Sequence, residues 1–87
     1  MSVKTVCKVL GNEERIQLIM CLAREQSVTA LLAKCTLSQS ALSQHLALLR
    51  TAGAVTVRQK GTYRYYRARP EYVACARTLS TIVTKTT

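Results

Sequence analysis

The chain has 87 residues, which is long enough for one globular domain and too short for two. Hydrophobic residues make up 48% of it, so a packed core is favoured over disorder, and the absence of Trp and Phe makes that core aliphatic. Thirteen Lys and Arg against four Asp and Glu give a net charge of +9, which is typical of a small domain that binds a polyanion. With one His and four carboxylates there are few groups for acid–base catalysis, so we expect no enzyme.

The positive charge is concentrated in the second half of the chain. Residues 1–49 carry five basic and three acidic side chains, a net charge of +2, whereas residues 50–87 carry eight and one, a net charge of +7. Concentration in one segment favours a nucleic-acid surface. The alternative is a solvated basic surface that only keeps the protein soluble.

Two helices are predicted at the start of the chain. The first has apolar residues at helical spacing and ends at Gly11; these residues are Val3, Val6, Cys7 and Leu10. Asn12 is a suitable N-cap for the second helix, since the two acids after it are favoured there by the helix dipole. We expect its apolar stripe to consist of Ile16, Ile19, Met20 and Ala23, with Leu18 and Leu22 on a flank.

A short third helix and a longer fourth helix follow. The third is predicted from about Val28 to Lys34, with Leu31 and Leu32 pointing inward. Ser38 is a natural N-cap for the fourth helix, which ends near Gly53. One side of this helix is apolar and faces the core through Ala41, Leu42, Leu46 and Leu49.

After Gly53 the pattern changes from helical to extended. Residues 54–59 and 62–68 are rich in Val, Thr and Tyr and flank a turn at Lys60-Gly61, so they predict a two-stranded hairpin. Pro70 then opens a last helix. The order of four helices, a hairpin and a closing helix predicts a mainly α, winged helix-turn-helix domain that spans residues 1–87.

Residues 38–53, SQSALSQHLALLRTAG, resemble the recognition segment of the ArsR/SmtB family of small dimeric bacterial repressors. LGNEERIQLI at 10–19 and QKGTYRYYRA at 59–68 support the resemblance, which covers roughly residues 9–69. It implies a winged helix-turn-helix fold, a homodimer formed through the first and last helices, and repression by occupying a double-stranded DNA operator. Arg64 departs from the family pattern, because that position is usually apolar.

The outward face of the fourth helix and the basic hairpin form the predicted DNA-binding surface. Short hydroxyls can approach base edges closely, and Gln can pair bidentately with adenine. Lys and Arg of the hairpin can neutralise phosphates. The predicted DNA-binding residues are Gln39, Ser40, Ser43, Gln44, Arg50, Arg58, Lys60 and Arg64. The alternatives are an ordinary polar helix surface and, for the hairpin tyrosines, stacking with single-stranded bases.

The apolar stripes of the first and last helices form the predicted dimer interface. Its residues are Val3, Val6, Leu10, Tyr72, Ala76, Leu79 and Val83. A two-fold dimer of this kind is expected to bind an inverted repeat.

No metal, cofactor or evolved thiol switch is expected. The family's usual thiolate site on the third helix has Ser27 and Thr29 in place of Cys, and the last helix lacks the Asp and His of the second common site. Relatives that sense oxidants use a Cys on the second helix and one on the last. Cys21 and Cys75 lie on those helices but out of position, and Cys7 and Cys75 fit apolar stripes as small hydrophobes. A thiol-switched repressor is the alternative.

The remaining expectations concern location and a different class of partner. The chain has no CxxC pair, no signal-peptide pattern and no apolar run of about 18 residues, so we expect a reduced, cytoplasmic bacterial protein with no membrane contact. The alternative from another class is a basic module that binds RNA or a protein partner.

Overall fold

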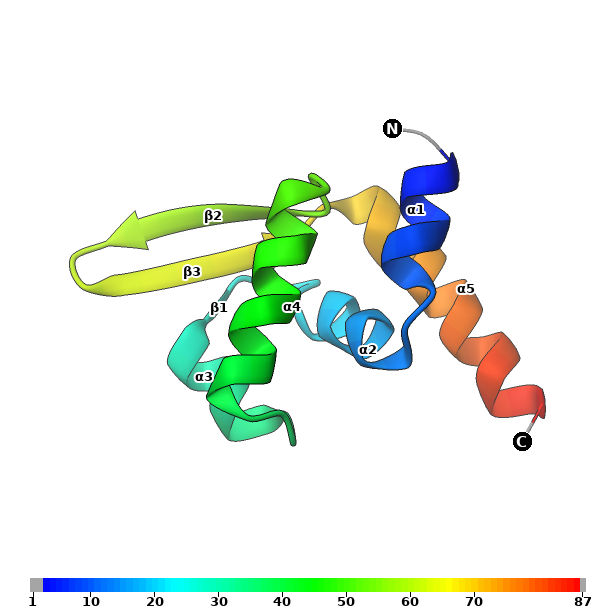
Figure 1. Cartoon of the computed structure of the whole chain (residues 1–87), viewed down its shortest axis with the longest axis horizontal. Helices are drawn as coiled ribbons and strands as arrows, with labels where there is room; N and C mark the ends of the chain where they lie inside the picture. The colour runs from blue at the N-terminus through cyan, green and yellow to red at the C-terminus, as the bar shows by residue number, and fades with distance from the viewer. Residues whose placement is uncertain (1–2, 87) are drawn as a thin grey trace.

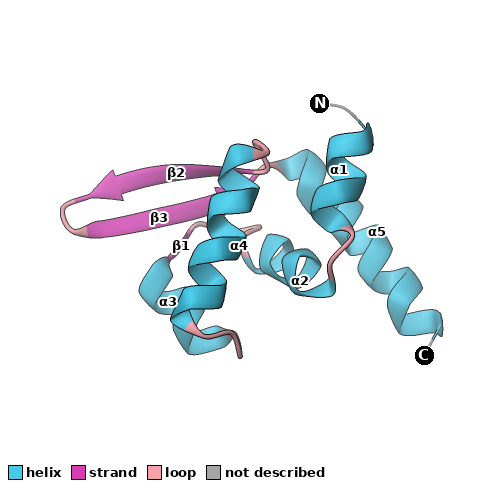
Figure 2. Cartoon of the chain, in the orientation of Figure 1, coloured by secondary structure: helices cyan, strands magenta, loops and turns pink. Residues whose placement is uncertain are grey.

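The computed structural model describes residues 3–86 and the side chains of residues 3–82. Its elements are, in chain order, α1 (Val3–Leu10), α2 (Glu13–Cys21), β1 (Gln26–Ser27), α3 (Val28–Lys34), α4 (Gln39–Thr51), β2 (Val55–Lys60), β3 (Tyr63–Ala68) and α5 (Pro70–Thr86). The β2–β3 hairpin projects from one end of the molecule, and α1 and α5 lie at the other end (Figure 1). Helix α4 runs along the front between them, and the strands are confined to the hairpin side (Figure 2).

Local capping fixes where the helices begin and end, as the sequence predicts. The Asn12 side chain accepts a hydrogen bond from the Arg15 backbone N–H at 3.1 Å, and Ser38 accepts one from Ala41 at 3.1 Å. Helix α4 ends in a Schellman motif, in which Gly53 N–H bonds to Arg50 C=O and Ala54 N–H bonds to Leu49 C=O. Gly53 has a φ of +75°, a conformation that glycine adopts without strain, and the chain leaves α4 there toward β2.

The sheet has three strands in the order β1-β3-β2, so the prediction of a two-stranded hairpin is incomplete. Strand β1 contributes only two residues, which pair with Tyr66 and Tyr65. Pairing of β2 with β3 extends to Lys60 opposite Tyr63, so the turn is Gly61-Thr62 and Lys60 belongs to the strand. The predicted turn at Lys60-Gly61 is therefore wrong by one residue.

One aliphatic core joins the helices to the base of the hairpin. It is formed by buried residues of α1, α2, α3, α4 and α5 and by Val55, Tyr66 and Ala68 of the strands. The stripe predicted for α2 is shifted: Leu18 and Leu22 are fully buried, whereas Met20 is 37% exposed. This shift follows from the packing of α2 against α5, which covers the flank that the sequence leaves open.

Candidate nucleic-acid interface

Helix α4 presents a polar face to solvent. Leu42, Leu46 and Leu49 are buried, which turns the opposite side of the helix outward. Four of the predicted base-contacting residues, Gln39, Ser40, Ser43 and Gln44, are exposed on α4. They lie within the first half of the helix, directly after its cap at Ser38, and can therefore enter a groove N-terminus first.

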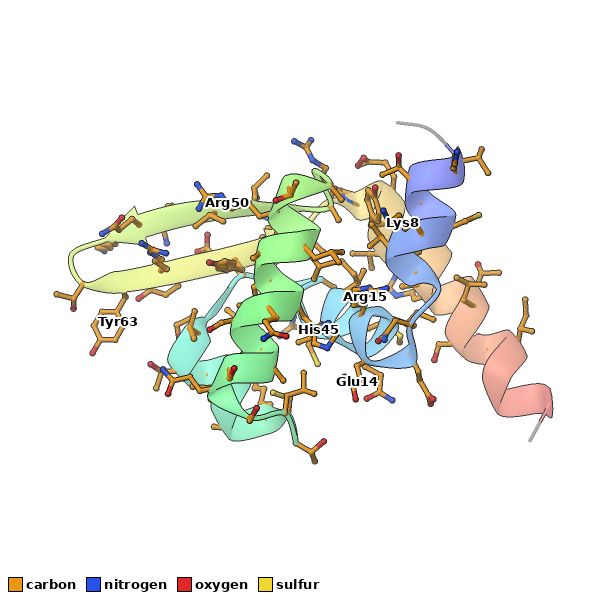
Figure 3. The ribbon with its side chains drawn as sticks, in the orientation of Figure 1. Lys8, Glu14, Arg15, His45, Arg50 and Tyr63 are labelled. Carbon is orange, nitrogen blue, oxygen red and sulfur yellow. The ribbon has the colours of Figure 1, made fainter. Side chains whose placement is uncertain are left out.

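An interaction between α2 and α4 holds this helix in place. His45 Nε2 lies 2.9 Å from Glu14 Oε2, and the His45 side chain is only 15% exposed (Figure 3). His45 therefore points toward the body of the protein and not along the polar face. The pair forms a hydrogen bond across the helix-turn-helix.

A groove separates α4 from the hairpin. It is lined by Ser43, Ala47, Arg50 and Thr51 of α4 and by Arg64 and Tyr66 of β3, with Val28 and Leu46 also contributing. Because side chains alternate along a strand, Arg64 lies on the same sheet face as the buried Tyr66 and so faces α4. Arg50 extends from α4 toward the hairpin (Figure 3). Two predicted DNA-binding arginines, one from each element, therefore line one groove.

Arg58 lies on the opposite face of the hairpin and has a partner within the protein. Its Nη2 and Nε atoms donate to the two carboxylate oxygens of Glu25 at 2.7 and 3.1 Å, and its guanidinium lies 5.0 Å from the centre of the Tyr65 ring. The hydrogen bond lowers the pKa of Glu25 and raises the pKa of Arg58. The eight predicted DNA-binding residues therefore do not share one surface, and Arg58 is neutralised by Glu25.

Lys60 and Tyr63 form the last pair of the hairpin before its turn, and both are exposed. Tyr63 extends from the tip of the hairpin (Figure 3). Tyr65 and Tyr66 are half-buried and buried, respectively, so at most one tyrosine of the three is freely exposed. This arrangement does not provide the row of exposed rings that stacking with successive single-stranded bases would use.

Sequence reasoning missed Arg15, which fastens α1 to α2. Its guanidinium donates to the backbone carbonyls of Val9 at 2.7 Å and Lys8 at 3.2 Å, at the C-terminal end of α1 (Figure 3). A cation is favoured at such an end by the free carbonyls and the helix dipole. The only signal in the sequence is a basic residue soon after a predicted helix, which is too common to identify this contact.

The predicted dimer interface is smaller than the sequence suggests. Tyr72 and Ala76 are fully buried in the core of the single chain, so assigning them to a surface for a second copy is wrong. Leu10 is only 3% exposed and lies at the floor of the hollow described next. Val3, Val6 and Leu79 line an apolar hollow between α1 and α5 together with Cys7 and Cys75. The side chain of Val83 lies outside the described residues.

Three of the four cysteines are accessible in the single chain: Cys7, Cys21 and Cys75 are exposed, and Cys35 is half-buried. Cys7 and Cys75 lie on the two helices of the predicted dimer interface, so their burial in a dimer stays a prediction. Cys7 and Cys75 line one hollow, whereas Cys21 and Cys35 line another. The alternative redox pair, Cys21 and Cys75, is therefore divided between two sites. Among the described residues no three His, Cys, Asp or Glu side chains come together to hold a metal ion.

A polar helix in a helix-turn-helix, beside a basic hairpin, defines a winged helix-turn-helix DNA-binding protein. Residues 12–57, just over half of the chain, match the family model for bacterial regulatory proteins of the arsR family. The chain belongs to this family of DNA-binding transcriptional regulators.

Curated relatives and solved structures agree with this assignment. The transcriptional activator HlyU of Vibrio cholerae is 47% identical over 60 residues, which are 68% of this chain and 56% of HlyU. The arsenic resistance transcriptional regulator ArsR1 of Pseudomonas putida is 41% identical over 68 residues, 76% of this chain and 53% of ArsR1. The chain thus spans a little over half the length of these curated relatives.

Among solved structures, HlyU from Vibrio cholerae matches with a TM-score of 0.80 and 37% identity, covering 91% of this chain and 88% of that one. The transcriptional repressor BigR from Xylella fastidiosa matches with a TM-score of 0.83 and 30% identity, covering 92% and 84%. No helix in the described part of the chain is long and apolar enough to cross a membrane.

Proposed function

We propose that this protein is a homodimeric transcriptional repressor that occupies an inverted-repeat operator in bacterial genomic DNA, in the cytoplasm, without a metal inducer. The observation that carries the proposal is the exposed polar face of α4 beside a groove with two arginines. Gln39, Ser40, Ser43 and Gln44 would contact base edges, and Arg50, Lys60 and Arg64 would contact phosphates.

The apolar hollow between α1 and α5 supports the homodimer. Val3 is 80% exposed, and its neighbours in the hollow are mostly apolar. A second copy related by a two-fold axis would cover this surface and present two α4 helices to successive major grooves, about one helical turn apart. The geometry favours a duplex operator over the RNA- or protein-binding alternative.

Ser27 stands where the family's usual metal site has a Cys, and its role in the structure supports a repressor without a metal inducer. The Ser27 hydroxyl accepts a hydrogen bond from the Ala30 backbone N–H at 3.1 Å and caps α3. The hydroxyl of Ser27 is therefore used as a helix cap, and hydroxyls are poor ligands for thiophilic metals.

The test is to select bound fragments from bacterial genomic DNA with the purified protein and to measure its mass by sedimentation. We expect enrichment of an inverted repeat, protection of both half-sites and a dimer at micromolar concentration. A monomer that binds one half-site tightly would overturn the dimer. Stronger competition by RNA than by duplex DNA would favour the basic interaction module.

A second candidate, a thiol-switched repressor, is favoured by the position of Cys7 and Cys75 in one hollow at the proposed dimer face. Peroxide would convert the two thiols to a disulfide and two water molecules. Operator binding is then expected to fall tenfold or more with peroxide and to return with a reductant. Single Cys7→Ser and Cys75→Ser variants would not show that response, and Cys35→Ser is the control because Cys35 lies in the other hollow.

A further inference from the structure

Arg50 and Arg64 come from different elements and line the same groove between α4 and β3. Neither side chain has an acidic partner or a hydrogen bond among the described residues, and no Asp or Glu lines the groove. Two guanidinium groups at one groove repel each other unless an anion lies between them. None of the described residues that line the groove supplies that anion.

The anion that fits this groove is a phosphodiester. The groove has a volume of about 340 Å³ and opens beside Ser43 and Ala47 on the α4 face described above. With α4 in the major groove, the phosphate backbone that borders this groove would pass between α4 and the β2–β3 hairpin, which is the wing. Arginine offers a planar fork of donors that matches phosphate oxygens, and contacts to phosphate fix the register of a protein on the duplex.

The hairpin has two further arginines, Arg58 and Arg67, and Arg58 is paired with an acidic side chain. Arg58 lies on the opposite face, where Glu25 accepts both of its hydrogen bonds. Arg64 occupies the groove-facing side of the same hairpin without such a partner.

From these observations we propose that Arg50 and Arg64 bind one backbone phosphate of duplex DNA together, at the seam between α4 and the wing. The inference rests on the proposed function, because the phosphate contact would fix the position of α4 in the major groove of the DNA. Arg58 is a positioning residue that fastens the hairpin to the segment before β1 and makes no phosphate contact.

The test uses a random-sequence 30-bp duplex, because phosphate contacts are independent of sequence. Affinity is measured over a series of salt concentrations for the wild type, Arg50→Gln, Arg64→Gln, the double variant and Arg58→Gln. Arg58→Gln is the matched control, since it removes the same charge from the opposite face of the same hairpin. Thermal unfolding followed by circular dichroism checks that each variant folds.

Loss of one shared phosphate is expected to lower the salt slope by about 0.9 in the double variant, whereas each single variant keeps one guanidinium on that phosphate and is expected to change the slope little. Arg58→Gln is expected to keep the wild-type slope. If the salt slope of the double variant falls by about 1.8, the two arginines bind two separate phosphates. If its slope equals that of Arg58→Gln, they bind no phosphate. Either result overturns the shared site. If the wild type itself shows no salt-dependent duplex binding, the proposed function fails instead.

Discussion

His45 Nε2 lies 2.9 Å from Glu14 Oε2, and this contact joins the middle of α4 to the first turn of α2. It links residues 31 positions apart. The exposed face of α4 points outward partly because His45 is held on the other side. The pair therefore connects helix packing to the orientation of the predicted base-contacting residues.

Replacing His45 with Ala is expected to lower the free energy of unfolding by at most about 1 kcal/mol, since it removes a hydrogen bond whose Glu14 end is 57% exposed. Glu14→Gln keeps an acceptor oxygen and is expected to cost less. Glu13→Gln, in the same turn but without this contact, is the control. Urea unfolding gives the free energy of unfolding of all three variants. Equal losses in Glu13→Gln and His45→Ala would show that the His45–Glu14 contact does not stabilise the protein.

Gln44 and Lys60 are expected to contribute different kinds of DNA contact. Gln44→Ala is expected to weaken binding to the selected operator by roughly 1–3 kcal/mol with little effect on random duplex, because a bidentate base contact is lost. Lys60→Ala is expected to weaken both and to reduce the salt slope. Fluorescence anisotropy with the two duplexes separates the effects. Equal loss on both duplexes for Gln44→Ala would show that α4 is not the recognition helix.

The sequence predicts most of the helices because their signals are local. Asn12, Ser38 and Gly53 mark ends of α2 and α4 by hydrogen bonds that span at most five residues. Strand β1 escapes prediction because two residues cannot show an alternating pattern.

The contacts that organise the site are invisible to the same reasoning. Arg58 and Glu25 are 33 positions apart, and their pairing depends on how the segment before β1 approaches the hairpin. The sequence therefore predicts the same phosphate-binding role for Arg58 and Arg64. Only the three-dimensional structure separates the neutralised arginine from the one in the groove.

Glu25 is expected to make stability depend on pH. The hydrogen bond with Arg58 lowers the pKa of Glu25 in the folded protein, so folding favours its ionised form. The stabilisation is fully present above the unfolded pKa, near 4.5, and is lost as pH falls through the lower folded value. Unfolding midpoints between pH 7 and pH 3 are expected to fall more steeply in the wild type than in Glu25→Gln. Identical pH profiles would argue against a persistent pair.

Tyr72 is fully buried, and its hydroxyl has no hydrogen-bond partner among the residues that the structure describes. Burial raises the pKa of this hydroxyl, so the neutral form is favoured in the folded state and stability declines as pH rises above 10.0. Tyr72→Phe removes the unpaired group and is expected to raise the free energy of unfolding by about 1 kcal/mol at pH 7. It should also flatten the decline above pH 10.0. Destabilisation by more than that amount would reveal a partner for the hydroxyl.

A protein with all four cysteines replaced is expected to bind its operator with near-normal affinity. None of the four lies among the polar residues of α4 or lines the α4–wing groove, so their replacement leaves the DNA-binding surface intact. Cys7, Cys21 and Cys75 are exposed, which permits Ser there, and the half-buried Cys35 is better replaced by Ala.

Zinc, arsenite or mild peroxide is likewise expected to leave the affinity of the intact protein unchanged. Anisotropy with the selected operator measures both. A reversible tenfold loss with peroxide that vanishes in Cys7→Ser or Cys75→Ser, with a dimer retained, would instead establish the thiol-switched repressor.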